Sequence, residues 1–298
     1  MTEGLAPDDM FDVAFVGRAN IDLTVHVPHR ARPGRTAVGS SLTARPGGKS
    51  LNQAITAARA GGRTCLVTNV GGDTWGHQIA DALVHEKVDT RHLTVIPDAT
   101  TGAAVIEVTP DGESYITLAL SPPTELTAHH ILHATADLHA TVTVVQLDLP
   151  TEPVTVLLQH RPGPILIGNL IPHPDHTPDL LRHLDVLVVN HHEATAILHT
   201  TTHDALDAAT ALHRLGPRTV VVTAGPHGAA YTNEHTHGTI PAPTVPVVDT
   251  TGAGDAFLGR LALALARHTP LPEAVTTAVH AGAETVQQSG ATTRSHDR

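Results

Sequence analysis

The sequence has little of what secreted, membrane-bound or nucleic-acid-binding proteins carry. It contains one cysteine, Cys65, so no disulfide framework can form, and only 2% of its 298 residues are aromatic. No apolar run approaches the roughly 18 residues of a membrane span. Eighteen basic residues face 29 acidic ones, and the formal net charge of −11 disfavours nucleic acid as a partner. Residues 1–10 have neither the basic nor the apolar part of a signal peptide, so we expect a cytoplasmic protein without nucleic-acid or membrane partners.

What is present suits one globular α/β domain over 1–298, because 41% of the residues are hydrophobic and no linker or repeat interrupts the chain. Short β-rich runs alternate with helical patterns, and the runs are apolar on both sides. This alternation predicts a doubly wound, mainly parallel sheet flanked by helices. The expected strands are 12–17, 64–71, 141–148, 164–169, 185–190 and 219–225. The expected helices are 50–61, 74–87, 151–160, 192–199, 203–215, 255–268 and 271–288.

Two segments break the alternation. Residues 21–46 hold two β-rich runs separated by Pro and Gly, and residues 102–120 hold two more around a "PDG" turn. Neither fits a βα unit, so together they predict a small β lid over a cleft. Because exposed strand edges favour pairing, we expect a homodimer formed through this lid.

The stretch "TARPGGKSLNQAITAARAGG" (43–62) contains the letters GKS that end a phosphate-binding P-loop. A P-loop requires glycine five residues before the Gly-Lys pair, where this chain has Thr43, and no strong strand precedes it. What remains is a helix start with Gly48, Lys49 and Asn52 in or before its first turn. Free amides and polar side chains at such a start suit a hydroxyl-rich or anionic ligand, although a capped surface helix with a solvated lysine would show the same letters.

The stretch "VVDTTGAGDAFLGRLALALARH" (247–268) carries the stronger signal. Gly252, Ala253 and Gly254 leave backbone amides uncovered just before a helix, where the helix dipole adds positive potential and creates an anion hole. Asp255 follows at its mouth, where a carboxylate would repel a bound phosphate but could accept a proton from an attacking hydroxyl. The plainer interpretation is an aspartate that favours a helix N-terminus.

These two stretches resemble the two signatures of the PfkB/ribokinase family of carbohydrate kinases, and "DTTGAGDAFLG" matches the second signature closely. The resemblance spans nearly the whole chain. Four more segments resemble family motifs in the family's order: "GRANIDLTV" (17–25), "VGGDTWG" (70–76), "VVNHHEA" (188–194) and "VTAGPHGA" (222–229).

The resemblance implies a role for each matching residue. Asp255 would be the catalytic base, and the amides of Gly252, Ala253 and Gly254 would hold the transferring phosphoryl group. The implied sugar-binding residues are Asn20, Asp22, Gly48, Lys49, Asn52 and Asp148. The implied ATP-binding residues are Asn190, Thr223, Gly225 and Gly228, with Gly252 and Gly254.

The resemblance also implies metal ions. Asn190 and Glu193 match an N-x-x-E motif that orders Mg²⁺ largely through water in the family, although the pair could be only a helix cap and its capping box. Carbonyls near Asp249 and Thr251, with the loop at Gly290, would form a K⁺ site.

The implied reaction is ATP-dependent phosphorylation of a hydroxyl on a small, pentose-like sugar. A sugar-phosphate kinase stays open because Arg32, Arg35 and Arg45 lie in the lid segment. A nucleoside kinase also stays open, although Tyr115 is the only aromatic residue of the second lid segment available to stack on a base. A non-catalytic sugar or nucleotide sensor is the alternative of another class, but such a protein would be expected to lose the base or the Mg²⁺ motif.

Overall fold

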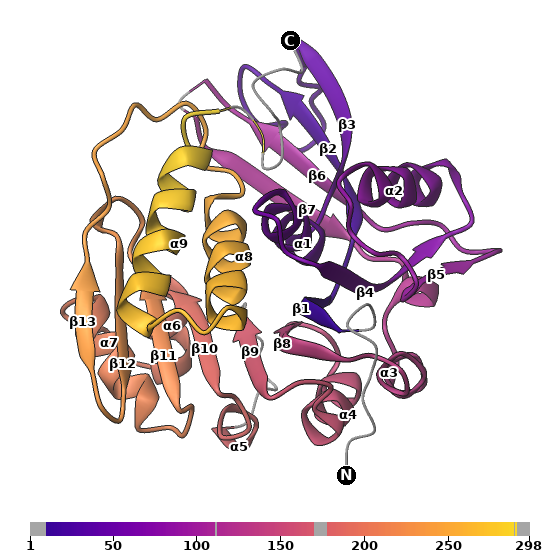
Figure 1. Cartoon of the computed structure of the whole chain (residues 1–298). Helices are drawn as coiled ribbons and strands as arrows, with labels where there is room; N and C mark the ends of the chain where they lie inside the picture. The colour runs from indigo at the N-terminus through magenta and orange to yellow at the C-terminus, as the bar shows by residue number, and fades with distance from the viewer. Residues whose placement is uncertain (1–9, 111, 170–177, 289, 291–298) are drawn as a thin grey trace.

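A computed structural model describes residues 10–110, 112–169, 178–288 and 290. Its main sheet has nine strands in the order β13-β12-β11-β10-β9-β8-β1-β4-β5 (Figure 1). The seven strands from β11 to β5 are parallel to their neighbours, and β12 and β13 add an antiparallel edge. Their bounds are β1 Phe11–Val16, β4 Thr64–Gly71, β5 Leu93–Ile96, β8 Ala140–Gln146, β9 Ile165–Asn169, β10 Val186–Asn190, β11 Thr219–Thr223, β12 Ala229–Asn233 and β13 His237–Ile240.

Helices cover both faces of this sheet, because its inner strands are apolar on both sides. All eight residues of β4 are buried, for example. One apolar core lies under α1 (Lys49–Arg59), α2 (Thr74–His85), α8 (Ala253–Ala266) and α9 (Leu271–Thr285). The other lies under α3 (Ala128–Thr135), α4 (Thr151–His160), α5 (Pro178–Leu181), α6 (His191–Leu198) and α7 (Ala205–His213). The predicted doubly wound α/β fold is therefore confirmed.

The second sheet has four strands in the order β3-β2-β6-β7, which are β2 (Asn20–His26), β3 (Ser41–Gly47), β6 (Ala103–Val108) and β7 (Ser114–Ala119). It contains the strands expected in 21–46 and 102–120. In Figure 1 it crosses above the carboxyl ends of the central strands of the main sheet. The prediction of a separate small sheet is therefore confirmed, with β3 and β7 as its edges.

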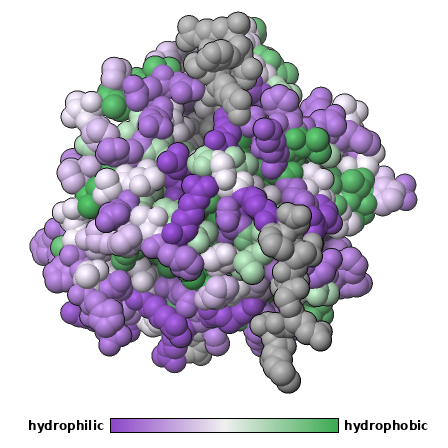
Figure 2. Space-filling model, viewed as in Figure 1, coloured by the Kyte–Doolittle hydropathy of each residue, from purple (hydrophilic) through white to green (hydrophobic). Residues whose placement is uncertain are grey.

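Some elements were not predicted: β5, α3, α5, and the β12–β13 hairpin. Each predicted strand and helix is present within a few residues of its expected bounds. One shift bears on the site, because α8 begins at Ala253 rather than Asp255 and so includes two of the three small residues. No helix in the described part of the chain is long and apolar enough to cross a bilayer. The side of the molecule that faces the viewer in Figure 1 is mainly hydrophilic, with small separate hydrophobic groups (Figure 2).

Candidate active site

A cavity of about 640 Å³ lies between the lid sheet and the carboxyl ends of the central strands. All six predicted sugar-binding residues line it: Asn20, Asp22, Gly48, Lys49, Asn52 and Asp148. Asp255, Gly252, Thr251 and Glu193 line it as well. Residues up to 235 positions apart in the sequence, from Asn20 to Asp255, thus meet at one place.

The helix pair α1 and α8 fixes the position of Asp255. The Asp255 carboxylate accepts hydrogen bonds from Asn52 Nδ2 at 3.2 Å and from Gln53 Nε2 at 3.0 Å, both on α1. This geometry depends on Gly259 of α8, because a Cβ there would approach the Gln53 carbonyl oxygen to 2.5 Å. The two helices therefore pack backbone to backbone next to the carboxylate, and α1 supplies both donors.

Burial raises the pKa of the Asp255 carboxyl above its ordinary value, while the charge of Lys49 and the bonds from Gln53 and Asn52 act against that rise. A carboxylate that is desolvated yet held by two amides is both oriented and more basic than an exposed aspartate. Such a group suits proton abstraction better than simple helix capping.

The amides predicted to form the anion hole are only partly available. Among the described residues, no acceptor takes a hydrogen bond from the amides of Gly252 or Gly254, whereas the Ala253 amide donates to the Thr250 carbonyl at 3.3 Å. Gly252 and Thr251 line the cavity, while Ala253 and Gly254 do not. Within the described part of the chain, the start of α8 therefore has two amides without an acceptor, those of Gly252 and Gly254, and of these two residues Gly252 lines the cavity.

Asn20 and Asp22 lie at the start of β2, and Asn20 Nδ2 donates to Asp22 Oδ1 at 2.7 Å. Burial raises the pKa of Asp22, and the nearby charge of Asp255 adds to the rise, while the Asn20 bond opposes it. The start of α1 can approach this strand only because Gly48 has no side chain. A Cβ at Gly48, whose φ is 98°, would meet the Arg18 carbonyl oxygen at 2.8 Å.

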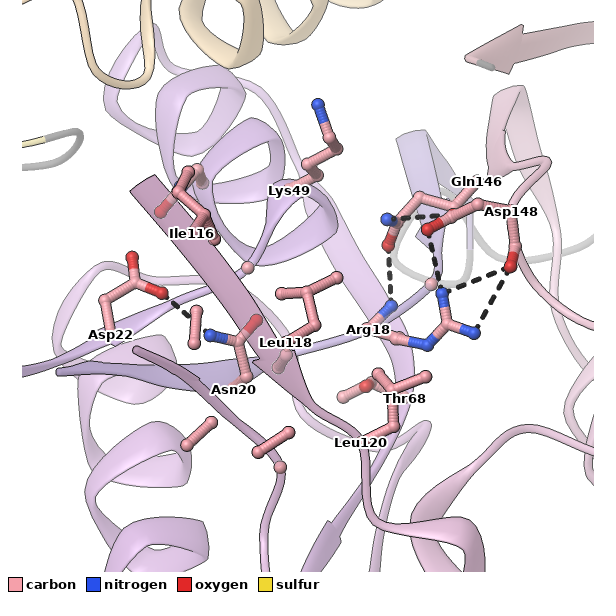
Figure 3. Close-up of a pocket in the computed structure, with 18 of the residues that line it drawn as sticks. Arg18, Asn20, Asp22, Lys49, Thr68, Ile116, Leu118, Leu120, Gln146 and Asp148 are labelled. Carbon is pink, nitrogen blue, oxygen red and sulfur yellow. Dashed lines mark hydrogen bonds and ion pairs between the residues drawn. The ribbon is translucent and has the colours of Figure 1, made fainter. Parts of the chain in front are cut away.

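Asp148 forms an ion pair with Arg18, which the sequence analysis did not predict. Arg18 Nη1 donates to Asp148 Oδ2 at 2.9 Å, and Gln146 Nε2 donates to Asp148 Oδ1 at 3.3 Å. The side-chain oxygen Oε1 of Gln146 also accepts a hydrogen bond from the Arg18 backbone amide at 2.7 Å. Figure 3 shows these three residues together at one side of the cavity, with Asn20 and Asp22 at the other. The sequence signal for this group was the polar Gln146 at the end of a mainly apolar strand, where an isolated glutamine is unusual.

Except for Gly252, the predicted ATP-binding residues do not line the cavity. Thr223 at the end of β11 pairs with Asn190 at the end of β10, so the two predicted segments are neighbours. The loop after β11 closes by a bond from the Ala224 amide to the Gly228 carbonyl at 2.8 Å, around a short turn that begins at Gly225. Asn190, Thr223, Gly225 and Gly228 are not among the residues that line the cavity.

The Asn190–Glu193 pair forms the capping box that the plainer interpretation expected. Glu193 N donates to Asn190 Oδ1 at 2.9 Å, and Asn190 N donates to Glu193 Oε2 at 2.8 Å. The Glu193 carboxylate nevertheless lines the cavity. Burial raises its pKa, against the Asn190 amide and the charge of Lys49. A structural role therefore does not prevent this carboxylate from facing a ligand.

The predicted monovalent-cation region is tied together by Asp249. Its carboxylate accepts from the Thr251 amide and from the Gly290 amide, both at 2.8 Å. The loop near Gly290 therefore lies against the 249–251 loop, as a shared cation site would require. These two bonds use part of the acceptor capacity of the Asp249 carboxylate.

A lidded cleft with an oriented carboxylate beside free amides defines a small-molecule kinase of the ribokinase-like fold. Residues 10–298 match the model of the pfkB family of carbohydrate kinases, and this chain belongs to that family.

Relatives and solved structures agree with that assignment. The chain is 30% identical to a ribokinase of Bacillus subtilis, over 95% of both chains. It superposes on the crystal structure of a Thermotoga maritima ribokinase with a TM-score of 0.86, at 28% identity and over 94% of each chain. An Arabidopsis thaliana ribokinase complexed with ribose and ATP gives a TM-score of 0.81, at 25% identity and over 94% of each chain.

Proposed function

We propose that this carbohydrate kinase transfers the terminal phosphoryl group of ATP to a hydroxyl of a small, uncharged, pentose-like sugar, with Asp255 as the general base. One observation carries the proposal: the Asp255 carboxylate, oriented by two amides of α1, shares its cavity with the hydroxyl-binding side chains of Asn20, Asp22 and Asn52. The ribokinase relatives, one of them complexed with ribose and ATP, support a sugar as acceptor and ATP as donor.

In this proposal Asp255 accepts the proton of the attacking hydroxyl as that oxygen bonds to phosphorus. The amides of Gly252 and Gly254 and the dipole of α8 stabilise the negative charge on the transferring group. Lys49 carries the nearby positive charge, since it acts on the pKa of both Asp255 and Glu193. A general base of this kind contributes roughly 10²–10⁴-fold to the rate.

ATP would lie along the ends of β10 and β11, against the loop of Thr223, Gly225 and Gly228. The carboxylate of Glu193, with Asn190, would hold Mg²⁺ largely through water, and the ion would neutralise phosphate charge. One Glu193 oxygen is occupied by the helix cap, which suits outer-shell contact better than direct coordination.

Backbone carbonyls near Asp249 and Thr251 would hold K⁺ next to the start of α8. K⁺ is therefore expected to raise the rate. Equal rates in buffers that contain only Na⁺, only K⁺ or little monovalent cation would contradict this.

A homodimer through the lid would cover its exposed apolar residues. Leu42 on the edge strand β3 is 70% exposed, and on the edge strand β7 Ile116 is 62% exposed and Leu118 52%, although these two residues also line the cavity. Apolar edge strands of this kind favour pairing with a second copy. Light scattering at assay concentration is expected to give twice the chain mass of 31.2 kDa, and a monomer would contradict the dimer.

The alternatives within the family fit the cavity less well. Arg32, Arg35 and Arg45 do not line it, so they offer no phosphate grip for a sugar phosphate. The ring of Tyr115 lies under the guanidinium of Arg30, at 4.2 Å, and is also absent from the lining, which disfavours stacking on a nucleobase. A sensor without catalysis would have no need for the oriented Asp255.

The test is ADP formation from Mg·ATP with a panel of pentoses, hexoses, sugar phosphates and nucleosides. Turnover of a neutral pentose that disappears in Asp255→Ala is the expected result. Turnover of only a nucleoside or a sugar phosphate would replace the substrate assignment. Sugar binding without ADP release from any member of the panel would favour the sensor.

A further inference from the structure

Arg18 is an unexpected cation in the wall of the cavity. It lies between the end of β1 and the start of β2, and its guanidinium meets two carboxylates. Arg18 Nε and Nη2 donate to Glu125 Oε1 and Oε2 at 2.8 and 2.6 Å, and Nη1 donates to Asp148 Oδ2 at 2.9 Å. The three side chains are only 14–19% exposed, and all three residues line the cavity. We call these three residues the Arg18 cluster.

The guanidinium of this cluster has no donor left for a ligand. Arg has five N–H groups, one on Nε and two on each Nη. Besides the bonds above, Nη1 and Nη2 each donate to the Asp148 carbonyl oxygen at 3.3 Å, so all five are directed at protein acceptors. The carboxylates of Glu125 and Asp148, by contrast, retain lone pairs, since a carboxylate has about four acceptor positions.

The charge of the cluster points the same way. One guanidinium against two carboxylates gives a formal charge of −1. Over the whole described lining there are two basic residues, Arg18 and Lys49, and five acidic ones: Asp22, Glu125, Asp148, Glu193 and Asp255. Lys49 acts on Asp255 and Glu193, at the end where the phosphoryl group transfers. The Arg18 end therefore accepts hydrogen bonds and repels anions.

We propose that Arg18 is a specificity-determining residue that holds Glu125 and Asp148 as an acceptor-only, negatively charged end of the cavity. This end binds sugar hydroxyls and rejects sugars that carry a phosphate or a carboxylate. The inference rests on the proposed function and assigns to Arg18, Glu125 and Asp148 the preference for an uncharged sugar. A close like charge in a partly buried site is expected to lower kcat/KM by about 100-fold or more.

The first experiment measures ADP formation with D-ribose, 2-deoxy-D-ribose, α-D-ribose 1-phosphate and D-ribonate, and both of these anions keep the C5 hydroxyl free as a phosphoryl acceptor. The neutral pentoses are expected to exceed both anions by about 100-fold or more in kcat/KM. If either anion matches or exceeds ribose, the inference is overturned while the kinase assignment stands.

The second experiment changes the charge of the Arg18 cluster while keeping the shapes of its side chains nearly the same. Glu125→Gln removes one carboxylate and changes the formal charge of the cluster from −1 to 0. The ratio of ribose to ribonate in kcat/KM is expected to fall about tenfold, mainly through KM. Asp148→Asn serves as the second variant and is expected to shift the ratio in the same direction. An unchanged ratio in both folded variants would overturn the inference.

A matched control exists outside the cavity. Arg59 Nε and Nη2 bind both oxygens of Glu86 at 2.7 Å, so Glu86→Gln breaks a bidentate pair of the same kind between α1 and the end of α2. It is expected to leave the ribose-to-ribonate ratio unchanged. A shift in this control as large as that in Glu125→Gln would assign the effect to general destabilisation and overturn the inference.

Arg18 itself is tested by two substitutions. Arg18→Met leaves Glu125 and Asp148 to repel each other, and the KM for ribose is expected to rise about tenfold with a smaller change in kcat. Arg18→Lys restores the charge and is expected to recover part of the loss. Equal KM values in the wild type and Arg18→Met would overturn the inference.

A binding measurement keeps the two proposals separate. Calorimetry without ATP compares the affinities for ribose and ribose 1-phosphate in the wild type and in Glu125→Gln. A smaller difference between the two affinities in the variant supports the inference, even if no compound is phosphorylated. Absence of phosphorylation would refute the proposed function alone. Equal differences in both proteins would overturn the inference.

Discussion

The Asp255 end of the cavity is built from the starts of two helices, whereas the Arg18 end is built from two strand ends and a loop. At the first end, α1 and α8 each bring a short run of adjacent residues, and Asn52 and Gln53 both bind Asp255. At the second, Arg18 binds Glu125 and Asp148, which are 107 and 130 positions away in the sequence. In the roles proposed above, the reaction chemistry is held by compact motifs, while the end that excludes anions is assembled from residues far apart in the sequence.

The Asp255 end can be disrupted without replacing Asp255 by separating its two helices. In Gly259→Ala the new Cβ meets the Gln53 carbonyl at 2.5 Å, so α1 must move away from α8. A displacement of about 1 Å can lower kcat about 100-fold, and overpacking costs about 1–3 kcal/mol of unfolding free energy. Steady-state kinetics and denaturant unfolding measure both effects.

The control is Gly282→Ala in α9, where the new Cβ would meet the Ala253 carbonyl oxygen at 3.3 Å, so the backbone at the start of α8 has to move by only a few tenths of an ångström. It is expected to leave kcat within about twofold and stability within about 1 kcal/mol of the wild type. If the two alanine variants behave alike, the close contact of α1 and α8 does not control the site.

A buried glutamine supports each end, and the two can be compared directly. Gln53→Met removes one of the two donors to Asp255. Because that bond opposes the rise of the Asp255 pKa, its loss raises the pKa further. A base must be deprotonated, so the acid limb of the kcat/KM profile moves to higher pH and the rate below the limb falls about tenfold. An unmoved limb would show that Gln53 does not act on the base.

Gln146→Met is the corresponding change at the Arg18 end. Gln146 Oε1 accepts from the Arg18 amide at 2.7 Å and from Ser50 Oγ at 2.8 Å, and both donors lose their acceptor. The expected cost is about 1–3 kcal/mol of stability and a sugar KM raised several-fold, with an unmoved acid limb. A shifted limb or a loss confined to kcat would contradict the division between the two ends.

The smallest effect is expected outside both ends, at Asp73. Its carboxylate caps α2 through the Gly76 amide at 2.8 Å and binds the Thr101 amide at 2.8 Å and the Thr101 hydroxyl at 2.7 Å. Burial opposes the change, but these bonds hold the pKa of Asp73 below its ordinary value. Asp73→Ala is expected to cost about 1 kcal/mol in the free energy of unfolding, with kinetics unchanged.

The pH dependence of Asp73 has a defined sign. Because its folded-state pKa is lowered, its stabilisation is present above the ordinary aspartate value of 3.8 and is lost as pH falls through the folded-state pKa. Unfolding measured across acidic pH should therefore show a smaller decline for Asp73→Ala than for the wild type. Parallel curves would contradict this role.

The sequence predicted the fold where physical signals are local. Strands that are apolar on both sides, such as β4, and amphipathic helices, such as α1, can be predicted from the pattern of a few neighbouring residues. The missed elements lack that signal: β5 has four residues, two of them exposed, and α3 carries three histidines. The β12–β13 hairpin follows directly on the glycine-containing loop at Gly225, and the pattern indicated only that loop.

The candidate site divides in the same way. Asp255, Lys49 and Asn52 could be identified because each lies inside a contiguous motif. Arg18 could not, since its partners come from a loop and another strand, and no spacing predicts a contact across 107 residues. Gln53 stands next to Asn52 in the sequence, yet its role appears only once α8 packs against α1.

The rate of phosphoryl transfer in Asp255→Asn, at saturating ATP and sugar, separates a base from a binding residue. The amide keeps the shape of the carboxylate but cannot accept the hydroxyl proton. Sugar and ATP affinities are expected to stay within a few-fold of the wild type, while transfer falls by about 10²–10⁴-fold at pH values above the acid limb of the wild type. Transfer within tenfold of the wild type, with sugar still bound, would contradict the assignment of Asp255 as the base.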